Sequence, residues 1–134
     1  MIYLLDTNVC INHMRGKDAV LLQRFGQHQL ADIALCAIVV AELRYGAELS
    51  TDPPKEHGKV DTFVSQFVSL PFDDAAARLF GEIRHALASA GKQIGPYDTM
   101  IAAIALTHDL ILVTHNTNEF SRIAGLKLED WQIP

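Results

Sequence analysis

The sequence has little of what marks secreted, disulfide-rich or membrane-spanning proteins. It contains two cysteines in 134 residues, Cys10 and Cys36, without the close pairing typical of a disulfide framework or a zinc site. No apolar run approaches the roughly 20 residues that a transmembrane helix needs. The start lacks the basic, apolar and small-residue pattern of a secretory signal. These absences favour a cytoplasmic protein, away from membranes, whose two thiols are reduced and buried.

Positive charge is also scarce. The chain has 11 Lys and Arg against 16 Asp and Glu, which gives a formal net charge of −5. Such a surface does not attract nucleic acid as a whole, so a nucleic-acid substrate would need a local basic patch or bound cations. With 49% hydrophobic and 20% charged residues, the composition is that of a globular protein. The length predicts one domain, residues 1–134.

Short continuous apolar runs at residues 2–5 and 111–113 are typical of strands that are buried on both faces, as in a parallel sheet. Further strands are predicted at 33–36 and 126–128, with a short extended piece at 70–72. Helical spacing of apolar residues, with caps and breakers, predicts helices over 7–13, 18–25, 37–49, 55–68, 74–90 and 96–108. The alternation indicates an α/β fold, a compact parallel β-sheet flanked by α-helices.

The first strand ends abruptly in Asp6, Thr7 and Asn8. In an open parallel sheet, ligands bind in the crevice beyond the carboxyl ends of the strands. Asp6 therefore stands where a carboxylate would meet a substrate or a metal. The alternative is that one of these three residues only caps the following helix.

Two more acids lie within predicted helices. Glu42 has Ile38, Val39 and Tyr45 three and four residues away, so it falls on an apolar stripe where an unpaired carboxylate is costly. It could instead lie at the stripe's edge or meet an arginine from another element. Asp98 falls in the first turn of the helix that begins at Pro96, where capping alone would explain a carboxylate.

Asn116 follows the 111–113 strand, and Glu119 lies one turn further on, although a polar turn with local caps would also account for both. Asp6 and Asn116 leave strands at the same expected edge of the sheet, and the Asp98 helix enters from that edge. Several carboxylates in one pocket repel each other, and a divalent cation removes the conflict. Oxygen ligands favour Mg²⁺ or Mn²⁺ over zinc.

Four segments, LLDTNVCI, AELRYGAE, GPYDTMIAAIA and LVTHNTNEF, occur in this order along the chain. Together they resemble the PIN-domain ribonucleases, and more closely the VapC toxins of type II toxin–antitoxin modules. The resemblance implies a Mg²⁺-dependent endoribonuclease in which Mn²⁺ can substitute. It assigns catalytic and metal-binding roles to Asp6, Glu42 and Asp98, a catalytic role to Glu119 and orienting roles to Thr7 and Thr114. Asn116 occupies a catalytic position that is often aspartate in the family, which puts a second metal in doubt.

The same resemblance implies partners. The substrate would be RNA, with structured tRNA leading and the anticodon loop of initiator tRNA a specific case, so that cleavage inhibits translation. A VapB antitoxin would neutralise the toxin, and the chain would form a homodimer or a toxin–antitoxin hetero-oligomer. We expect RNA phosphates to meet basic side chains from the set Arg15, Lys17, Arg44 and Lys92. His115 receives no role.

Three rival interpretations remain open at the level of sequence. A phosphate-sensing receiver domain would need paired acids after the first strand and a lysine after a late strand, and neither is found. A phosphatase with two aspartates two residues apart is disfavoured because Asn8 replaces the second aspartate. A catalytically silent PIN-like domain is disfavoured by the intact Asp6, Glu42 and Asp98, but Asn116 leaves it open.

Overall fold

Five short parallel strands form the sheet of this computed structural model, which describes residues 1–134. The strand order is β3-β2-β1-β4-β5, and every neighbouring pair is parallel. This confirms the predicted α/β class. The strands are β1 (Tyr3–Leu5), β2 (Ile33–Cys36), β3 (Val68–Leu70), β4 (Ile111–Val113) and β5 (Leu128–Glu129).

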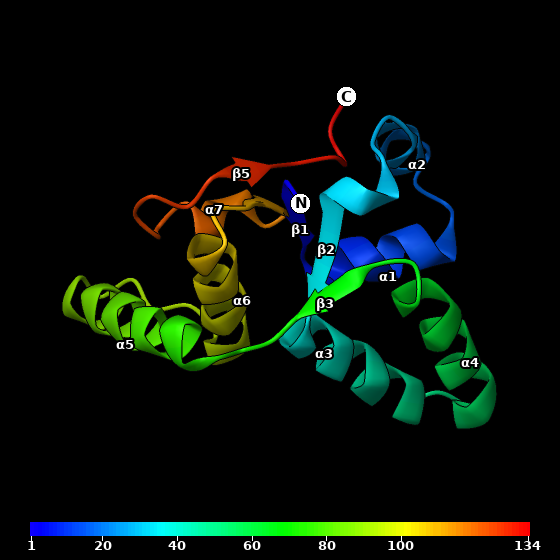
Figure 1. Cartoon of the computed structure of the whole chain (residues 1–134), viewed down its shortest axis with the longest axis horizontal. Coiled ribbons are helices and arrows are strands. Elements are labelled where there is room, and N and C mark those ends of the chain that lie inside the picture. Colours follow the sequence, from blue (N-terminus) through cyan, green and yellow to red (C-terminus); the bar gives the residue numbers. More distant parts are fainter.

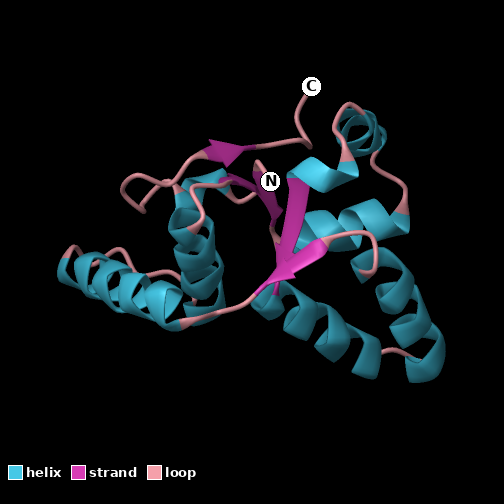
Figure 2. Cartoon of the chain, viewed as in Figure 1, coloured by secondary structure: helices cyan, strands magenta, loops and turns pink.

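Helices connect every pair of consecutive strands. They are α1 (Thr7–Arg15), α2 (Ala19–Gly26), α3 (Ala37–Glu48), α4 (Pro53–Val64), α5 (Asp74–Ser89), α6 (Pro96–Thr107) and α7 (Thr117–Phe120), with a 3₁₀ turn at Leu30–Asp32. In Figure 1, α5 and α6 lie side by side on the left, and α1 to α4 lie on the other side of the strands. Figure 2 shows the strands, in magenta, between these two groups of helices.

The order of the strands reverses direction once. The chain runs outward from β1 through β2 to β3, then crosses back to β4 on the other side of β1. Because parallel crossovers are right-handed, this reversal puts the two groups of helices on opposite faces of the sheet. The point of reversal, between β1 and β4, leaves a crevice beyond the carboxyl ends of these two strands.

The register of the two strands decides which residues enter the crevice. Tyr3 pairs with Ile111 and Leu5 pairs with Val113. The next residues, Asp6 and Thr114, therefore leave the sheet side by side. The backbone N–H of Asp6 donates to the carbonyl of Val113 at 3.0 Å, which continues the pairing to the first residue of the crevice.

Two predicted boundaries are wrong. The 55–68 helix is α4, which begins earlier, at Pro53, and ends at Val64. Val68, which we counted in the apolar spacing of this helix, instead pairs with Ala34 in β3 and replaces the extended piece expected at 70–72. The last strand is Leu128–Glu129 rather than 126–128. The first error arises because apolar residues of an edge strand can continue a helical spacing by chance. The second is a shift of a strand that is only two residues long.

The core is a continuous cluster of apolar side chains on both faces of the sheet. The α6 residues Ile101–Ala105 are fully buried, because small alanines let this helix approach the sheet closely. Cys10 and Cys36 are buried free thiols, as predicted. No helix has both the length and the apolarity that crossing a membrane requires.

The C-terminal segment completes this core through Trp131, which is 1% exposed. Its ring stacks on His28 with centroids 4.5 Å apart, and it meets the edge of Tyr3 at 5.1 Å. Its indole N–H donates to Glu129 Oε1 at 3.0 Å. In Figure 1 both termini lie near the middle of the long axis, in the upper half of the view. Trp131 thus fastens the chain end over the start of β1.

We expect Trp131→Ala to lower the free energy of unfolding by about 3 to 5 kcal/mol, because it opens a large cavity beside β1. Urea unfolding followed by circular dichroism measures the loss. Ile133→Ala is the control, since Ile133 is 51% exposed and its loss should stay within about 0.5 kcal/mol. Equal stability of the two variants would contradict this assignment.

Candidate active site

Asp6 is the most deeply placed acid of the crevice, with 5% of its surface exposed. One carboxylate oxygen, Oδ1, accepts the backbone N–H of Thr7 at 2.8 Å. The other, Oδ2, accepts the hydroxyl of Thr114 at 2.8 Å. Asp6 is therefore the N-cap of α1, as the capping alternative held, and it is also tied to the end of β4. Helix capping explains the bond from the Thr7 N–H. The bond from the Thr114 hydroxyl is separate and joins Asp6 to the end of β4 across the crevice.

Glu42 reaches the same place from α3. Its Oε1 accepts the Thr7 hydroxyl at 2.7 Å. The buried stripe of α3 consists of Val39, Leu43 and Ala47, so the expectation that Glu42 lies on this stripe needs correction: it is half-buried at the edge. The partner is a hydroxyl rather than an arginine, and a hydroxyl leaves the negative charge of the carboxylate uncompensated.

Asn116 and Glu119 enter from the segment after β4. The backbone N–H of Asn116 donates to Thr114 Oγ1 at 3.0 Å, and its side-chain amide donates to Glu119 Oε2 at 3.1 Å. The Asn116 amide thereby holds the Glu119 carboxylate in position without adding a charge. Its carbonyl oxygen, Oδ1, has no partner in the protein and can face a cation.

The fourth carboxylate belongs to Asp98, in the first turn of α6. Burial, followed by the negative charges of Asp6, Glu42 and Glu119, raises the pKa of Asp98 to about 6. The pKa of Asp6 is also raised, chiefly by burial, although its hydrogen bonds from Thr114 and Thr7 oppose the shift. Acids from four separate segments of the chain thus share one electrostatic field.

The residues fit a divalent cation, although they do not form a closed cage. No group of three or more acidic, histidine or cysteine side chains is arranged closely enough to hold a metal ion. Mg²⁺ usually needs only one or two carboxylates and keeps several of its waters. The donors here are carboxylate, amide and hydroxyl oxygens. A cation would also relieve the repulsion that raises the pKa of Asp98.

Two cavities open beside these acids. One of about 400 Å³ is lined by Asp6, Asn8, Ile11, Asn12, Arg15, His115, Asn116 and Gln132. The other, of about 680 Å³, is lined by Thr7, Asn8, Ile11, Ile38, Ala41, Glu42, Tyr45 and Tyr97. Asp6 is therefore reachable from the first cavity and Glu42 from the second.

The candidate RNA-binding residues differ in whether they line a cavity beside the acids. Arg15 lines the cavity beside Asp6, as an RNA-binding role requires. Arg44 does not line it, and its guanidinium pairs with Asp61 at 2.6 Å. An RNA-binding role for Arg44 stays a prediction, as do those of Lys17 and Lys92. His115, which received no role, pairs with Asp130 at 2.9 Å.

Sequence reasoning missed two polar residues of the cavity, Asn12 and Gln132. Asn12 lies four residues after Asn8, on the same face of α1, so helical spacing could have indicated it. Gln132 comes from the tail beyond β5, and no local pattern marks it.

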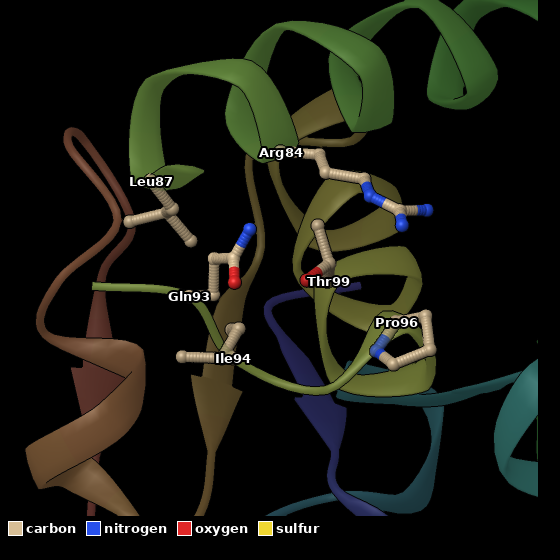
Figure 3. Close-up of a pocket in the computed structure, with 6 residues that line it drawn as sticks. All are labelled: Arg84, Leu87, Gln93, Ile94, Pro96 and Thr99. Carbon is tan, nitrogen blue, oxygen red and sulfur yellow. The ribbon is translucent and has the colours of Figure 1, made fainter. Parts of the chain in front are cut away.

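A third, smaller cavity of about 120 Å³ lies where α5 meets the start of α6. Figure 3 shows Arg84 of α5 extended over Pro96 and Thr99, with Gln93 and Ile94 on the adjoining loop. No acidic residue lines this cavity. It is therefore separate from the acid cluster, although Thr99 directly follows Asp98.

Comparison with known proteins agrees with this geometry. The PIN domain family model matches residues 3–126. The chain is 42% identical over 129 residues to the tRNA(fMet)-specific endonuclease VapC of Shigella flexneri, covering 96% of this chain and 97% of that protein. It is 38% identical to ribonuclease VapC2 of Haemophilus influenzae, with the same coverage. The crystal structure of DNA-bound VapBC from Salmonella typhimurium superposes with a TM-score of 0.91 at 39% identity, covering 98% of both chains.

The Thr114 hydroxyl bridges Asp6 and the backbone of Asn116, so its removal leaves a buried acceptor and a donor without partners. We expect Thr114→Val to lower the free energy of unfolding by about 1 to 3 kcal/mol. Thr114→Ser keeps the hydroxyl and should lose only about 0.8 kcal/mol for the missing methyl group. Urea unfolding in EDTA measures both. If the valine variant were as stable as the serine variant, the bridge would have no structural role.

The raised pKa of Asp98 predicts a pH dependence of stability. The folded state prefers the protonated acid, so the contribution is favourable below pH 3.8 and is lost as the pH rises through about 6. In EDTA, Asp98→Asn should therefore be more stable than the parent at pH 7.5, and the advantage should vanish at pH 3.5. Thermal unfolding across this range measures it.

The control is Asp74→Asn, in the exposed first turn of α5. It removes the same charge from an equivalent helix position, and it should give no such advantage at pH 7.5, because Asp74 is not among the four clustered acids. An equal gain in both variants would point to net charge rather than to the acid cluster.

Proposed function

The chain belongs to the PIN-domain family and within it to the VapC ribonucleases, and we propose that it is the toxin of a VapBC module that cleaves RNA in the cytoplasm with a divalent metal ion. The observation that carries the proposal is the meeting of Asp6, Glu42, Asp98 and Glu119 in one field. Membership in this family sets aside the receiver and phosphatase alternatives.

The proposed roles follow from the contacts. Asp6 and Asp98 would hold Mg²⁺, or Mn²⁺ in its place, with Glu42 completing the metal-binding set. Thr7 orients Glu42, and Thr114 orients Asp6, through the hydrogen bonds at 2.7 and 2.8 Å. Glu119, held by Asn116, adds a negative charge that acts on Asp98. A bound divalent cation supplies a Lewis acid that polarises a phosphodiester and lowers the pKa of water.

We propose tRNA as the substrate, and initiator tRNA in particular. Two relatives, at 42% and 40% identity over nearly their whole length, are named tRNA(fMet)-specific endonucleases. The open cavity beside Asp6 suits an unpaired segment such as the anticodon loop, whose bases can be spread apart on a protein surface. Cleavage there would inhibit translation.

We propose that a VapB antitoxin binds the groove between α1, α3 and α4. This groove, of about 390 Å³, has apolar and charged lining residues: Ile11, Met14, Arg15, Glu42, Leu43, Gly46, Ala47, Glu56, Lys59 and Val60. Glu42 belongs both to the groove and to the acid cluster. A peptide that lies in the groove with a basic side chain at its end could therefore reach the acids and block them.

A homodimer is proposed on different grounds. Tyr45 and Leu49 are 66% and 68% exposed on one face of α3, and Tyr97 nearby is 58% exposed. Large apolar side chains that gather on one face are typical of an interface. We infer that a second copy of the chain covers this face, alone or within a toxin–antitoxin hetero-oligomer.

The purified protein should cleave tRNA(fMet) in Mg²⁺ and lose this activity in EDTA. Asp98→Asn should lower the cleavage rate by more than the 10- to 100-fold loss that is typical of residues around a metal's ligands, and Thr7→Val should fall within that range. Gel analysis of tRNA fragments measures the rates.

Asp74→Asn serves as the matched control and should cleave as the parent does. Full activity of Asp98→Asn, or cleavage that persists in EDTA, would overturn the proposal. Binding of RNA and of VapB without any cleavage would support the catalytically silent alternative instead.

A further inference from the structure

The basic side chains of this acidic protein are distributed unevenly. Of 11 Lys and Arg residues, four are engaged in ion pairs with carboxylates: Arg44, Lys59, Arg78 and Lys127. Among the cations without a carboxylate partner, three lie around one short loop, residues 90–95, which joins α5 to α6. They are Arg84, Lys92 and Arg122, and all three are exposed.

Side-chain contacts separate these cations from the acids. The Glu119 carboxylate accepts from the side-chain amide of Asn116, in the acid cluster. Arg122 lies instead at a cavity of about 420 Å³, which is lined by Gly91, Lys92, Asn118, Ser121 and Arg122. No carboxylate and no apolar side chain lines it.

The loop continues this basic surface toward α5. Arg122 Nη1 donates to the carbonyl of Gln93 at 3.3 Å, which fixes α7 against the loop. On the other side, Gln93 lines the small cavity of Figure 3 together with Arg84. The guanidinium of Arg84 lies over the ring of Phe80, 5.9 Å from its centroid, which keeps it extended. The two cavities thus adjoin at residues 91–93 and together carry the three cations.

We propose that Arg84, Lys92 and Arg122 form a phosphate track that holds the sugar–phosphate backbone of the RNA as it enters the acid cluster, a proposal that rests on the proposed function. RNA fits this surface better than a peptide does, because the cavity that holds Lys92 and Arg122 has no apolar side chain to anchor a peptide. Phosphate oxygens are acceptors only, and Lys, Arg and the Asn118 amide offer donors.

The position of the track would also offset the repulsion between the acids and the RNA phosphates. Four carboxylates repel an incoming phosphate, and the net charge of −5 gives no general attraction. Arg122 is three residues after Glu119, so the cations begin about one helical turn from the acids. The phosphates on one side of the cleaved bond can therefore be neutralised while the scissile phosphate faces the acids.

The test compares two triple variants with the same loss of charge. Arg84→Gln, Lys92→Gln and Arg122→Gln remove the track. Lys55→Gln, Arg78→Gln and Lys127→Gln form the control, taken from exposed positions on α4, on the outer side of α5 and before β5. Anisotropy of a fluorescent RNA hairpin in EDTA measures binding at several salt concentrations, and tRNA cleavage in Mg²⁺ measures KM and kcat.

We expect the track variant to bind the hairpin several-fold more weakly, and its slope of log affinity against log salt to fall by about 2 to 3, because each lost phosphate contact removes about 0.7 to 0.9. Its KM should rise while kcat stays at the parent's value. The control variant should keep the parent's slope. Circular dichroism checks that both variants are folded.

Other results would overturn the inference in distinguishable ways. A parent that cleaves tRNA, with a track variant whose slope and KM match the parent's, leaves the proposed function intact and removes the track. Loss of VapB binding with unchanged RNA binding would assign the surface to a protein partner. A parent that neither binds nor cleaves RNA would overturn the proposed function and the track together.

Discussion

The parallel pairing of β1 with β4 is the constraint on which the site depends. It brings together two strand ends that are more than 100 residues apart in sequence, since the bond between Asp6 and Thr114 spans 108 positions. At this point the order of the strands reverses, so no helix closes the crevice beyond their carboxyl ends. A slip in this register by one residue would point Asp6 to the other face of the sheet.

The hydrogen bonds around Asp6 show how the fold tolerates a buried carboxylate. A backbone N–H and a hydroxyl each satisfy one oxygen, and both lower the pKa that burial raises. Asp98 lacks comparable support, and its pKa rises to about 6. The clustered negative charges therefore lower the stability of the folded state at neutral pH. A divalent cation would offset this cost, so cation binding and stability are coupled at the crevice.

The acids and one group of cations lie on different parts of the surface. The acids face the crevice at the reversal of the strands, whereas Arg84, Lys92 and Arg122, three of the seven cations without a carboxylate partner, lie around the loop between α5 and α6. Glu119 lies in α7 and bonds to Asn116, whereas Arg122, three residues later, bonds to the carbonyl of Gln93. These two contacts separate the surface proposed to attract RNA from the acids proposed to cleave it.

Much of this could be predicted from the sequence, because strands, helix starts and buried runs are local features. The runs before Asp6 and after residue 110 identified the inner strands, and Pro96 identified the start of α6. Edge elements were less certain: the residues around Val68 fit both a helical and an extended pattern, and only pairing with β2 decides between them.

The sequence by itself determined the class of the fold, the family, and which acids stand at strand ends and helix starts, since each of these depends on residues close together in the chain. The tertiary structure alone decided what each acid contacts. That Glu42 lies at the edge of its stripe and bonds Thr7, that Arg44 turns away to Asp61, and that Gln132 lines the crevice all depend on side chains meeting across elements. Such meetings leave no local pattern, because they are set by the packing of distant segments rather than by spacing along one of them.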